Sequence, residues 1–437
     1  EGAAAMMDRL AIIADGHVMG EIRKDRRGRI SLAYDEGWRR AEGAFPLSLS
    51  MPLVVADHDH ARIEPWLWGL LPDNEAILAR WGQRFQVSPR NPFALLSHVG
   101  EDCAGAVQIV PPERVDALCA EPTGHVQWLD DAEVAERIRI LRKDHAAWRI
   151  ARDGGQFSLA GAQPKTAFVY GDGRWGVPSG RMPTTHIVKP PIAGFEGHAE
   201  NEHICLALAR ALGLPAAASH VRTFDGEAAI IVERYDRLRS GDIIRRLHQE
   251  DMCQALCRSP SRKYENEGGP GASSIIELLR TSSARPNEDV WTFVRALALN
   301  WLIGGTDAHA KNYSMLIGAA GRARLAPLYD VASTLPYDFD SRKLRLAMKI
   351  GESYLLDDIS LRQWRKLASS VRLDEEQVRE ECLDLAQRFP DALADVIKTA
   401  KAEGLDETVL QRLSAVLSAR AAHCRKIMGA ASATDVD

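Results

Sequence analysis

The sequence predicts an α+β protein with two lobes, in which a β-rich first half precedes a helix-rich second half. Two observations predict this class. Short runs of apolar residues, separated by turn signals, dominate the chain up to about residue 240. From about residue 243 onward, long amphipathic stretches with helix start and stop signals take over. We expect three parts: residues 1–125, 126–240 and 241–437.

Composition and charge fit an ordinary globular protein. The chain has 437 residues, 46% of them apolar and 26% charged. The formal net charge of -5 gives no electrostatic reason for tight, autonomous nucleic-acid binding. No apolar run approaches the ~18 residues that span a bilayer, and the start "EGAAAMMDRL" lacks the pattern of a secretory signal. Seven mostly isolated cysteines indicate reduced thiols in a cytosol and no zinc site.

Several elements follow in order along the first half. Residues 10–33 alternate as short strands, with turns at "DGH" and "RRGR". "EPWLWGLLPDNEAI" is expected to form a short helix stopped by Pro72, and "NPFALLSHVG" a second helix. "AGAVQIVP" is expected to form a strand, and the pattern then weakens around residues 111–130.

The pattern of residues changes at residue 156, where a small-residue loop and further short strands begin. "QFSLAGAQPKTAFVYGDGRWGVP" is a small-residue loop between strands, and "THIVKPP" and "EAAIIVERYDR" are two further strands. Between them, "NEHICLALARALGLP" predicts a helix, because apolar residues recur every four positions before a Gly and a Pro.

Helices dominate the second half. Residues 287–305, "NEDVWTFVRALALNWLIGG", have acidic residues in the first turn, an apolar stripe and a Gly-Gly stop. After one hairpin, we expect helices near residues 360–371, 374–388, 391–402 and 407–427. The second lobe is therefore predicted to be helical apart from that hairpin.

The stretch "LIGGTDAHAKNYSML" (302–316) places chemistry-bearing side chains on a loop after a buried helix. Phosphoryl transfer needs a carboxylate that orients the acceptor hydroxyl and oxygen ligands for Mg²⁺. Asp307 and Asn312 have the Asp-x-x-x-x-Asn spacing that protein kinases use. The strands "NYSMLIG" and "RARLAPLYD" would fold Asp330 back beside Asn312. The alternative is a polar loop whose side chains only cap backbone groups.

Upstream residues fit the other half of a kinase site. Ser158–Lys165, "SLAGAQPK", would offer backbone N–H groups to phosphates, or would be a simple turn. Lys189 ends an apolar strand, where it would pair with phosphates or merely be solvated. Glu202 opens the next helix and would pair with Lys189, and Glu233–Tyr235 would form an adenine hinge. The order of these features along the chain is that of a kinase with two lobes.

The chain resembles the HipA family, the serine/threonine-kinase toxins of bacterial toxin–antitoxin pairs. The matching stretches are "PLSLSMPL", "GLLPDNEAI", "NPFALLSHVGEDCAGAV", "FSLAGAQPKTA", "THIVKPP", "NEHICLALARALGL", "IIVERYDR", "QEDMCQ", "KYENEGGPG", "LIGGTDAHAKNYS" and "LAPLYDVAS". They are numerous, ordered and spread over nearly the whole chain. The resemblance implies a protein-kinase-like (HipA-like) fold.

The resemblance also implies roles for individual residues, with ATP and Mg²⁺ as cofactors. Asp307 would be the catalytic base, Asn312 and Asp330 the Mg²⁺ ligands, and Lys189 a contact to the ATP phosphates. The rest of the nucleotide site would be Ala160, Gly161, Ala162, Gln163, Pro164 and Lys165 in the phosphate loop, Glu233, Arg234 and Tyr235 at the hinge, and His309, Ala310, Lys311 and Tyr329. Ser158 matches the family's self-phosphorylated serine, where a phosphate would repel the nucleotide.

The family's partners follow from the same resemblance. Members phosphorylate an aminoacyl-tRNA synthetase, often the glutamyl enzyme, and bind HipB, a dimeric helix-turn-helix antitoxin on operator DNA. DNA contact would be mainly indirect. Residues 361–372 carry Arg362, Arg365, Lys366 and Arg372, which would touch phosphates or simply be solvated. We expect a bacterial cytoplasmic protein with no membrane partner.

The chain departs from the family pattern at two positions, and two alternative functions remain open. Pro164 stands where some relatives carry a charged residue, and Ala308 replaces an expected glycine, but neither removes a catalytic group. A small-molecule kinase shares the Asp-x-x-x-x-Asn pattern and the later aspartate. A non-catalytic co-repressor would bind only antitoxin and DNA, which retention of Asp307, Asn312 and Asp330 disfavours.

Overall fold

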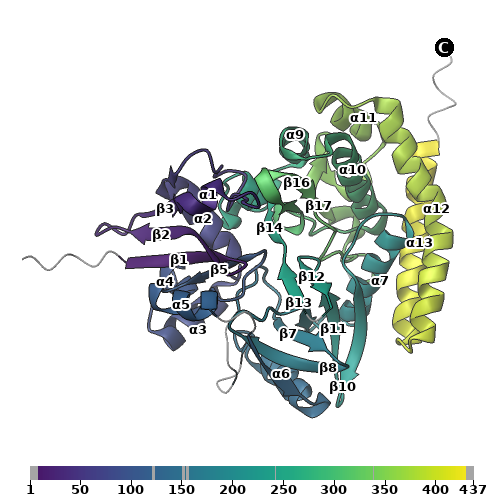
Figure 1. Cartoon of the computed structure of the whole chain (residues 1–437). Coiled ribbons are helices and arrows are strands. Elements are labelled where there is room, and N and C mark those ends of the chain that lie inside the picture. Colours follow the sequence, from purple (N-terminus) through teal and green to yellow (C-terminus); the bar gives the residue numbers. More distant parts are fainter. Residues whose placement is uncertain are drawn as a thin grey trace, which may run out of the picture.

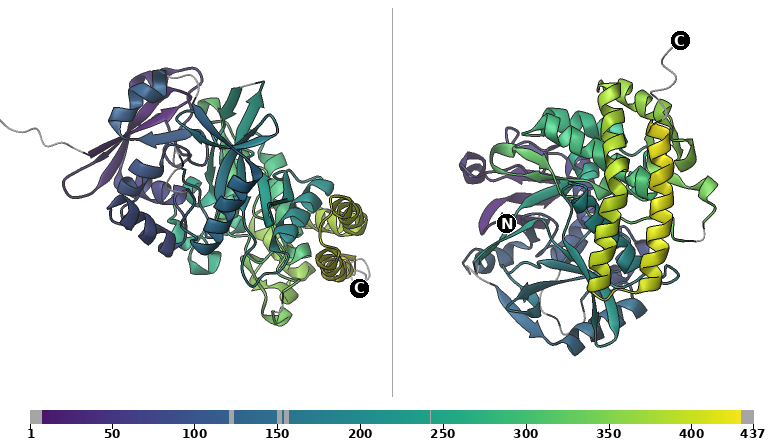
Figure 2. Two further views of the ribbon diagram at one scale, coloured as in Figure 1. Left: turned by 90° about the horizontal axis from the view of Figure 1, so that it is seen from below. Right: turned by 90° about the vertical axis from the view of Figure 1, so that its right-hand side faces the viewer.

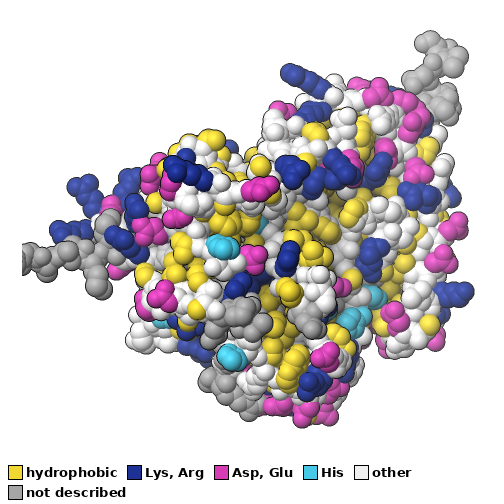
Figure 3. Space-filling view, viewed as in Figure 1, with side chains coloured by type: hydrophobic (Ala, Val, Ile, Leu, Met, Phe, Trp, Pro, Cys, Tyr) yellow, Lys and Arg dark blue, Asp and Glu magenta, His cyan; other side chains and the backbone are white. Residues whose placement is uncertain are grey.

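The computed structural model describes residues 8–120, 124–149, 153, 157–241, 243–337 and 339–429. Two sheets and their helices form the first half of the chain, and long helices line the opposite edge of the molecule (Figure 1). The predicted α+β class with two lobes is therefore confirmed. Acidic and basic side chains are interspersed over the visible face (Figure 3). The start of the chain, on which the expectation of no secretory signal rests, lies largely outside the described residues.

The first sheet is antiparallel, with the strand order β4-β3-β2-β1-β5. Alternate side chains of β1 point to opposite faces: Leu10 and Ile12 join the core under α2 to α4, and Ile13 packs with Leu118 of α5. The elements are β1 (Asp8–Ala14), β2 (His17–Lys24), β3 (Ile30–Tyr34), β4 (Asp57–His58), β5 (Val107–Val110), α1 (Glu36–Arg40), α2 (His60–Leu70), α3 (Glu75–Phe85), α4 (Pro92–Val99) and α5 (Val115–Ala120).

Helix α2 ends before Pro72, as predicted, but the sequence analysis missed α3. The side chain of Asn74 caps α3 by accepting hydrogen bonds from the N–H groups of Ala76 and Ile77. Asp73, in the chain between α2 and α3, contacts both the predicted phosphate loop at Gly161 and the predicted catalytic loop at Lys311.

The second sheet has six strands in the order β10-β11-β9-β7-β8-β6. It lies between two helices, because Ala229 and Ile231 of β11 face α6, whereas Ile230 and Val232 pack with Ala199 of α7. The elements are β6 (His125–Leu129), β7 (Thr166–Gly171), β8 (Arg174–Ser179), β9 (His186–Lys189), β10 (Ser219–Phe224), β11 (Glu227–Glu233), α6 (Asp131–Lys143) and α7 (His198–Ala211).

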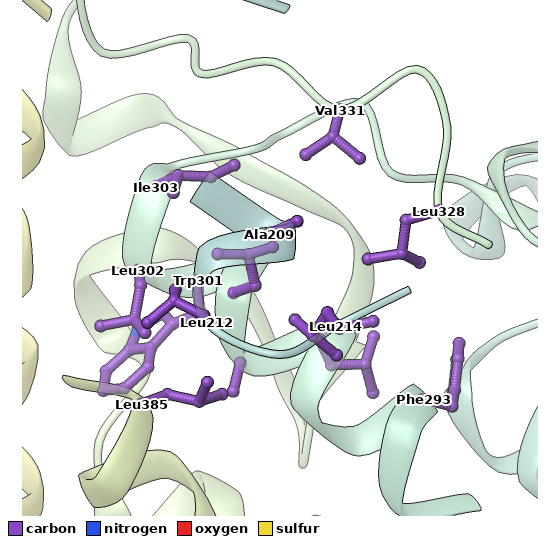
Figure 4. Close-up of a cluster of buried hydrophobic side chains, with 14 of the residues drawn as sticks. Ala209, Leu212, Leu214, Phe293, Trp301, Leu302, Ile303, Leu328, Val331 and Leu385 are labelled. Atoms are coloured by element: carbon purple, nitrogen blue, oxygen red, sulfur yellow. The ribbon is translucent and has the colours of Figure 1, made fainter. Parts of the chain in front are cut away.

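The C-terminal lobe is built around α10, whose apolar residues are buried against α7, α12 and α13. Figure 4 shows Trp301 and Leu302 of α10 beside Leu385 of α12 and Leu212. The helices are α8 (Met252–Ala255), α9 (Ala272–Ser282), α10 (Pro286–Ile303), α11 (Leu361–Ser370), α12 (Glu375–Ala402) and α13 (Glu407–Gly429). The strands are β12 (Arg237–Ser240), β13 (Ile243–Arg246), β14 (His248–Asp251), β15 (Ser314–Ile317), β16 (Ala323–Leu325), β17 (Arg345–Ile350) and β18 (Ser353–Leu355).

One continuous helix, α12, replaces the two helices predicted at residues 374–388 and 391–402. Pro390 lies inside it. A proline in a helix interior costs about 3 kcal/mol, because it removes one backbone hydrogen bond. Burial of Leu385, Phe389 and Leu393 along one stripe outweighs that cost. α12 lies side by side with α13 along the edge of the molecule (Figure 2).

The C-terminal lobe holds more strands than the single hairpin that the sequence predicts. The predicted hairpin β15–β16 is present, and β14 extends it to three strands. The pairs β12–β13 and β17–β18 are additional. The seven cysteines are free. Within the described ranges, no helix combines the length and the apolar character needed to cross a bilayer.

Candidate active site

The candidate catalytic loop begins where α10 ends. Gly304 adopts φ 64°, and a Cβ there would lie 2.6 Å from Cγ of Leu335, so only glycine fits without displacing that side chain. The turn releases residues 306–312 from the helix and leaves the side chain of Asp307 exposed. The sequence signal for this stop, Gly304–Gly305, therefore has a steric cause.

Asn312 joins Asp307 to Asp330. Its Nδ2 atom donates to the backbone carbonyls of Asp307 and Asp330, both at 3.3 Å. The hairpin β15–β16 returns the chain to this point, which is the arrangement that the spacing predicts. The structure therefore brings together the three residues on which the kinase interpretation depends.

Lys189 links the two lobes inside the site. Its Nζ atom lies 2.7 Å from Oε1 of Glu202 on α7 and 2.8 Å from Oδ1 of Asp330. Burial alone lowers the pKa of Lys189, but the two carboxylates outweigh it and hold the pKa above its ordinary value. Lys189 in turn keeps the pKa of Asp330 well below its usual range, whereas burial raises the pKa of Glu202. A charged lysine thus stands beside the candidate metal ligand.

Backbone strain marks Asp330. Its φ of 56° lies in the left-handed region, which non-glycine residues adopt at a cost, in turns and at functional sites. Its side chain is still 45% exposed, so a carboxylate oxygen remains accessible beside the ion pair with Lys189.

The predicted phosphate loop lies against the chain between α2 and α3. The N–H of Asp73 donates to the carbonyl of Gly161 at 3.2 Å, and Gly161 has φ 110°. Lys165 folds back under the loop, where its Nζ atom donates to the carbonyl of Gln163 at 2.7 Å. Burial, together with the nearby charge of Lys189, lowers the pKa of Lys165 to about 7. Gln163 also reaches the carbonyl of Pro190 at 3.3 Å.

Ser158 is buried. Its Oγ atom donates to the carbonyl of Leu70 at 2.8 Å, and its N–H donates to the carbonyl of Asp102 at 2.9 Å. The hydroxyl is thus used inside the protein and is not presented to the site. Ser158 reaches a phosphate donor only if its segment leaves this position.

The predicted hinge is divided between two roles. Glu233 is exposed at the end of β11, and the ring of Tyr235 lies 5.6 Å from that of Tyr329. The Arg234 guanidinium, in contrast, is buried in ion pairs with Asp236 and Asp102. Of the three predicted hinge residues, Glu233 is exposed and Tyr235 packs against Tyr329, whereas the side chain of Arg234 is directed into the interior.

Lys311 likewise points away from the candidate phosphate site. Its Nζ atom lies 2.9 Å from Oδ2 of Asp251, 3.2 Å from the carbonyl of Gly69 and 3.6 Å from Oδ1 of Asp73. Asp73 also pairs with Lys263 at 3.0 Å. The catalytic loop is thus fastened to the N-terminal region through a buried lysine, whereas Ala310 is buried beside it.

Sequence reasoning missed two features of this site. Tyr264 donates from its hydroxyl to Oδ1 of Asp307 at 2.7 Å, and its ring stands edge-on to that of His309. Asp73 and Asp251 hold Lys311. The stretches "KYENEGGPG", "QEDMCQ" and "GLLPDNEAI" carry these residues, but their letters alone do not say what they contact. Arg362, Arg365 and Lys366 lie on α11, around a surface hollow that Leu361, Ser369 and Glu375 also line.

The residues present fit a magnesium ion held jointly with phosphate. Asp330 offers an accessible carboxylate oxygen, and Asn312 uses its Nδ2 atom on two carbonyls, so that its Oδ1 atom points away from them. Mg²⁺ prefers such oxygens and usually takes only one or two carboxylates, completing its shell with water and phosphate. Among the described residues, no cluster of three or more His, Cys, Asp or Glu forms an all-protein metal cage.

Comparison with known proteins agrees with this geometry. The HipA N-terminal domain model matches residues 10–110, and the HipA-like C-terminal domain model matches residues 157–393. The protein Y4mE of Sinorhizobium fredii is 38% identical over 411 residues, which cover 93% of this chain and 96% of that protein. The serine/threonine-protein kinase toxin HipA of Shewanella oneidensis is 30% identical over 399 residues, 87% of each chain.

A solved structure resembles the whole chain. It is the Shewanella oneidensis toxin–antitoxin complex of HipA, HipB and operator DNA, whose matching chain has a TM-score of 0.84 and 27% sequence identity. The match covers 98% of this chain and 100% of that one. Because both family domains are present in order and the HipA of Shewanella oneidensis aligns over 87% of each chain, the chain belongs to the HipA family of kinase toxins.

Proposed function

We propose that this kinase is an ATP- and Mg²⁺-dependent serine/threonine protein kinase whose target is an aminoacyl-tRNA synthetase of the glutamyl type. One observation carries the proposal: Asn312 bridges Asp307 to Asp330, and Lys189 contacts Asp330 from the other lobe. Asn312 thus ties together the backbones that carry the proton-accepting carboxylate of Asp307 and the oxygen ligand Asp330, and Lys189 adds a cation beside Asp330. This set is what phosphoryl transfer requires.

The proposed roles follow from the contacts. Exposed Asp307 accepts the proton of the acceptor hydroxyl as the new O–P bond forms and the bond between the γ-phosphorus and the β,γ-bridging oxygen breaks. Lys189, held charged by two carboxylates, binds phosphate oxygens. Mg²⁺ at Asn312 and Asp330 would neutralise charge on the phosphates. ADP and a phosphoserine or phosphothreonine are the products.

Ser158 would serve as a built-in off switch. A phosphate does not fit where its Oγ atom is buried against the carbonyl of Leu70. Adding a dianion there would expel the segment, and the adjoining loop at Ala160–Lys165 would lose its place against Asp73. The kinase would then bind ATP poorly.

The partners proposed are a HipB-type helix-turn-helix antitoxin dimer and, mainly through it, operator DNA. Support comes from the whole-chain likeness to the HipA of the Shewanella complex. Phosphorylation of the synthetase would block aminoacylation and halt growth, and the antitoxin would neutralise the kinase and repress the operon with it. We place these events in the bacterial cytoplasm.

The experiment that tests the kinase proposal is incubation of purified protein with Mg-ATP, followed by phosphate mapping with mass spectrometry. We expect phosphate on Ser158 in the parent and none in Asp307→Asn. Asp225→Asn, in the exposed turn between β10 and β11, is the matched control and should behave like the parent. Equal phosphorylation in Asp307→Asn and parent would overturn the assignment of the base.

The synthetase is tested separately. Parent protein and Mg-ATP are added to purified glutamyl-tRNA synthetase, and phosphate incorporation and aminoacylation are measured together. We expect one phosphorylated serine or threonine and loss of aminoacylation, both absent with Asp307→Asn. Phosphorylation of Ser158 without any modification of the synthetase would retain the kinase and reject this substrate.

A further inference from the structure

The segment at residues 258–271 crosses the catalytic loop and delivers Tyr264 to Asp307. The Tyr264 hydroxyl donates to Oδ1 of Asp307 at 2.7 Å. We propose that Tyr264 is a positioning residue: it holds one oxygen of the Asp307 carboxylate so that the other faces the acceptor hydroxyl. This inference rests on the proposed function, because it assumes that Asp307 is the base.

Contacts on both sides of Tyr264 fix where its hydroxyl points. On one side, Lys263 pairs with Asp73 at 3.0 Å, and its carbonyl accepts from the N–H of Ala310 at 3.2 Å. On the other side, the Glu265 carboxylate accepts from the N–H of Lys349 at 2.8 Å. The segment is therefore fastened to the N-terminal region, the catalytic loop and β17, so Tyr264 is held in place by three separate parts of the protein.

A tight turn completes this mounting. The N–H of Gly269 donates to the carbonyl of Tyr264 at 2.9 Å, and a Cβ at Gly269 would lie 2.1 Å from the carbonyl oxygen of Arg262. Only glycine allows this close approach of backbone to backbone. The Gly-Gly-Pro letters of "KYENEGGPG" thus gain a structural reason, which is to hold the backbone of Tyr264.

The ring and the proton of Tyr264 also suit the role. The ring stands edge-on to His309, with centroids 5.0 Å apart and planes at 85°. Burial, and then the hydrogen bond with Asp307, raise the pKa of Tyr264 above its ordinary value, so the phenol stays a donor at physiological pH. An exposed aspartate rotates freely about its last bond unless one oxygen is held. Tyr264 supplies that restraint.

The first test is the steady-state kinetics of Tyr264→Phe with Mg-ATP and the protein substrate that accepts the phosphate. We expect kcat to fall about tenfold, as part of the larger contribution of a general base, with the KM for ATP changed less than about twofold. Tyr170→Phe, on β7 of the second sheet, is the matched control and should retain the parent values. An unchanged or higher kcat in Tyr264→Phe overturns the inference, and a higher kcat would mean that Tyr264 competes with the acceptor.

The second test does not depend on activity. 3-Fluorotyrosine is placed at position 264, and its ¹⁹F signal is followed in a pH titration of the otherwise parent protein and of Asp307→Asn. We expect Asp307→Asn to shift the signal and to lower the pKa of the fluorinated phenol, because a hydrogen-bonded negative charge is removed. Identical titrations would show that the contact is absent and overturn the inference. Activity retained in Asp307→Asn would instead reject the proposed base, so the two failures are distinguishable.

Discussion

At the scale of single residues, the site depends on a buried cation between two carboxylates. Lys189 touches Glu202, which is 1% exposed, and Asp330. Removing one partner of a buried pair is more harmful than removing both, because an unpaired charge stays behind. The triad therefore combines a functional role with a stability cost if it is broken.

Lys189→Met should lower the free energy of unfolding by about 3 kcal/mol and abolish phosphoryl transfer, because Glu202 is left without its counter-charge. The double variant Lys189→Met/Glu202→Gln should regain most of the stability and none of the activity. Urea unfolding and a phosphorylation assay check both expectations. Equal losses of stability in the single and double variants would contradict the account.

Lys165 should couple ATP binding to proton uptake. Its pKa of about 7 means that much of the ammonium has lost its proton at pH 8, mainly because of burial and then because of Lys189. Bound phosphates favour the charged form and so raise the pKa, which draws a proton from the buffer. Titration calorimetry of ATP binding at pH 8, in buffers of different ionisation enthalpy, should show proton uptake. The same experiment at pH 6 should show much less uptake, because Lys165 is already largely protonated there. Lys165→Met should remove it, and pH-independent heats in the parent would contradict it.

At the scale of elements, a helix end places the catalytic loop. α10 is held along its length by the core shown in Figure 4. Its left-handed end at Gly304 then directs the chain out toward Asp307. The position of the loop is therefore set by a long helix that is buried over most of its residues.

Gly304→Ala should therefore affect both stability and rate. The left-handed φ and the 2.6 Å approach to Leu335 should cost about 1–3 kcal/mol of unfolding free energy. Displacement of the loop should lower kcat more than it changes the KM for ATP. Thermal unfolding and steady-state kinetics measure the two effects, with Gly404→Ala as a control that shares the positive φ but has open space around it. A full-rate Gly304→Ala would show that the loop is positioned by other contacts.

At the scale of the whole molecule, the N-terminal region contacts the candidate active site directly. Asp73 contacts Lys263 and Lys311, and thus both segments that flank Asp307. Ser158 and the phosphate loop rest on the same part of the chain, at Leu70 and Asp73. The first sheet and its helices therefore support both the candidate phosphate loop and the segments beside Asp307.

Asp73→Asn should weaken this connection. Burial opposes ionisation of Asp73, but Lys311 and Lys263 outweigh it and lower its pKa. A carboxyl with a lowered folded-state pKa stabilises the protein above its unfolded pKa, and this contribution is lost as pH falls through the folded value. We expect the free energy of unfolding of the parent to exceed that of Asp73→Asn by about 2 kcal/mol at pH 7. This difference should shrink below about pH 4. Unfolding free energies across pH test this, and a difference that grows in acid would contradict it.

The sequence by itself determined the local features. Glycines mark the end of α10, apolar alternation marks the strands, and the spacing of Asp307, Asn312 and Asp330 predicts a loop followed by a hairpin. These features depend on neighbours along the chain, so residue types and the periodicity of apolar residues are enough to predict them. The sequence also predicts the α+β class, because strand-like alternation of apolar residues fills the first half of the chain and helix-like periodicity fills the second half.

Only the tertiary structure decided which groups face the site. Lys311 and Arg234 match a nucleotide motif by position, yet buried carboxylates draw both into the interior, including Asp236 two residues from Arg234. Pro390 is expected to end a helix, but burial of apolar residues both before and after it in the chain keeps α12 continuous. Tyr264 reaches Asp307 across 43 residues, through contacts to three separate parts of the fold. Such outcomes depend on charges and surfaces that meet only after folding, and no local pattern encodes them.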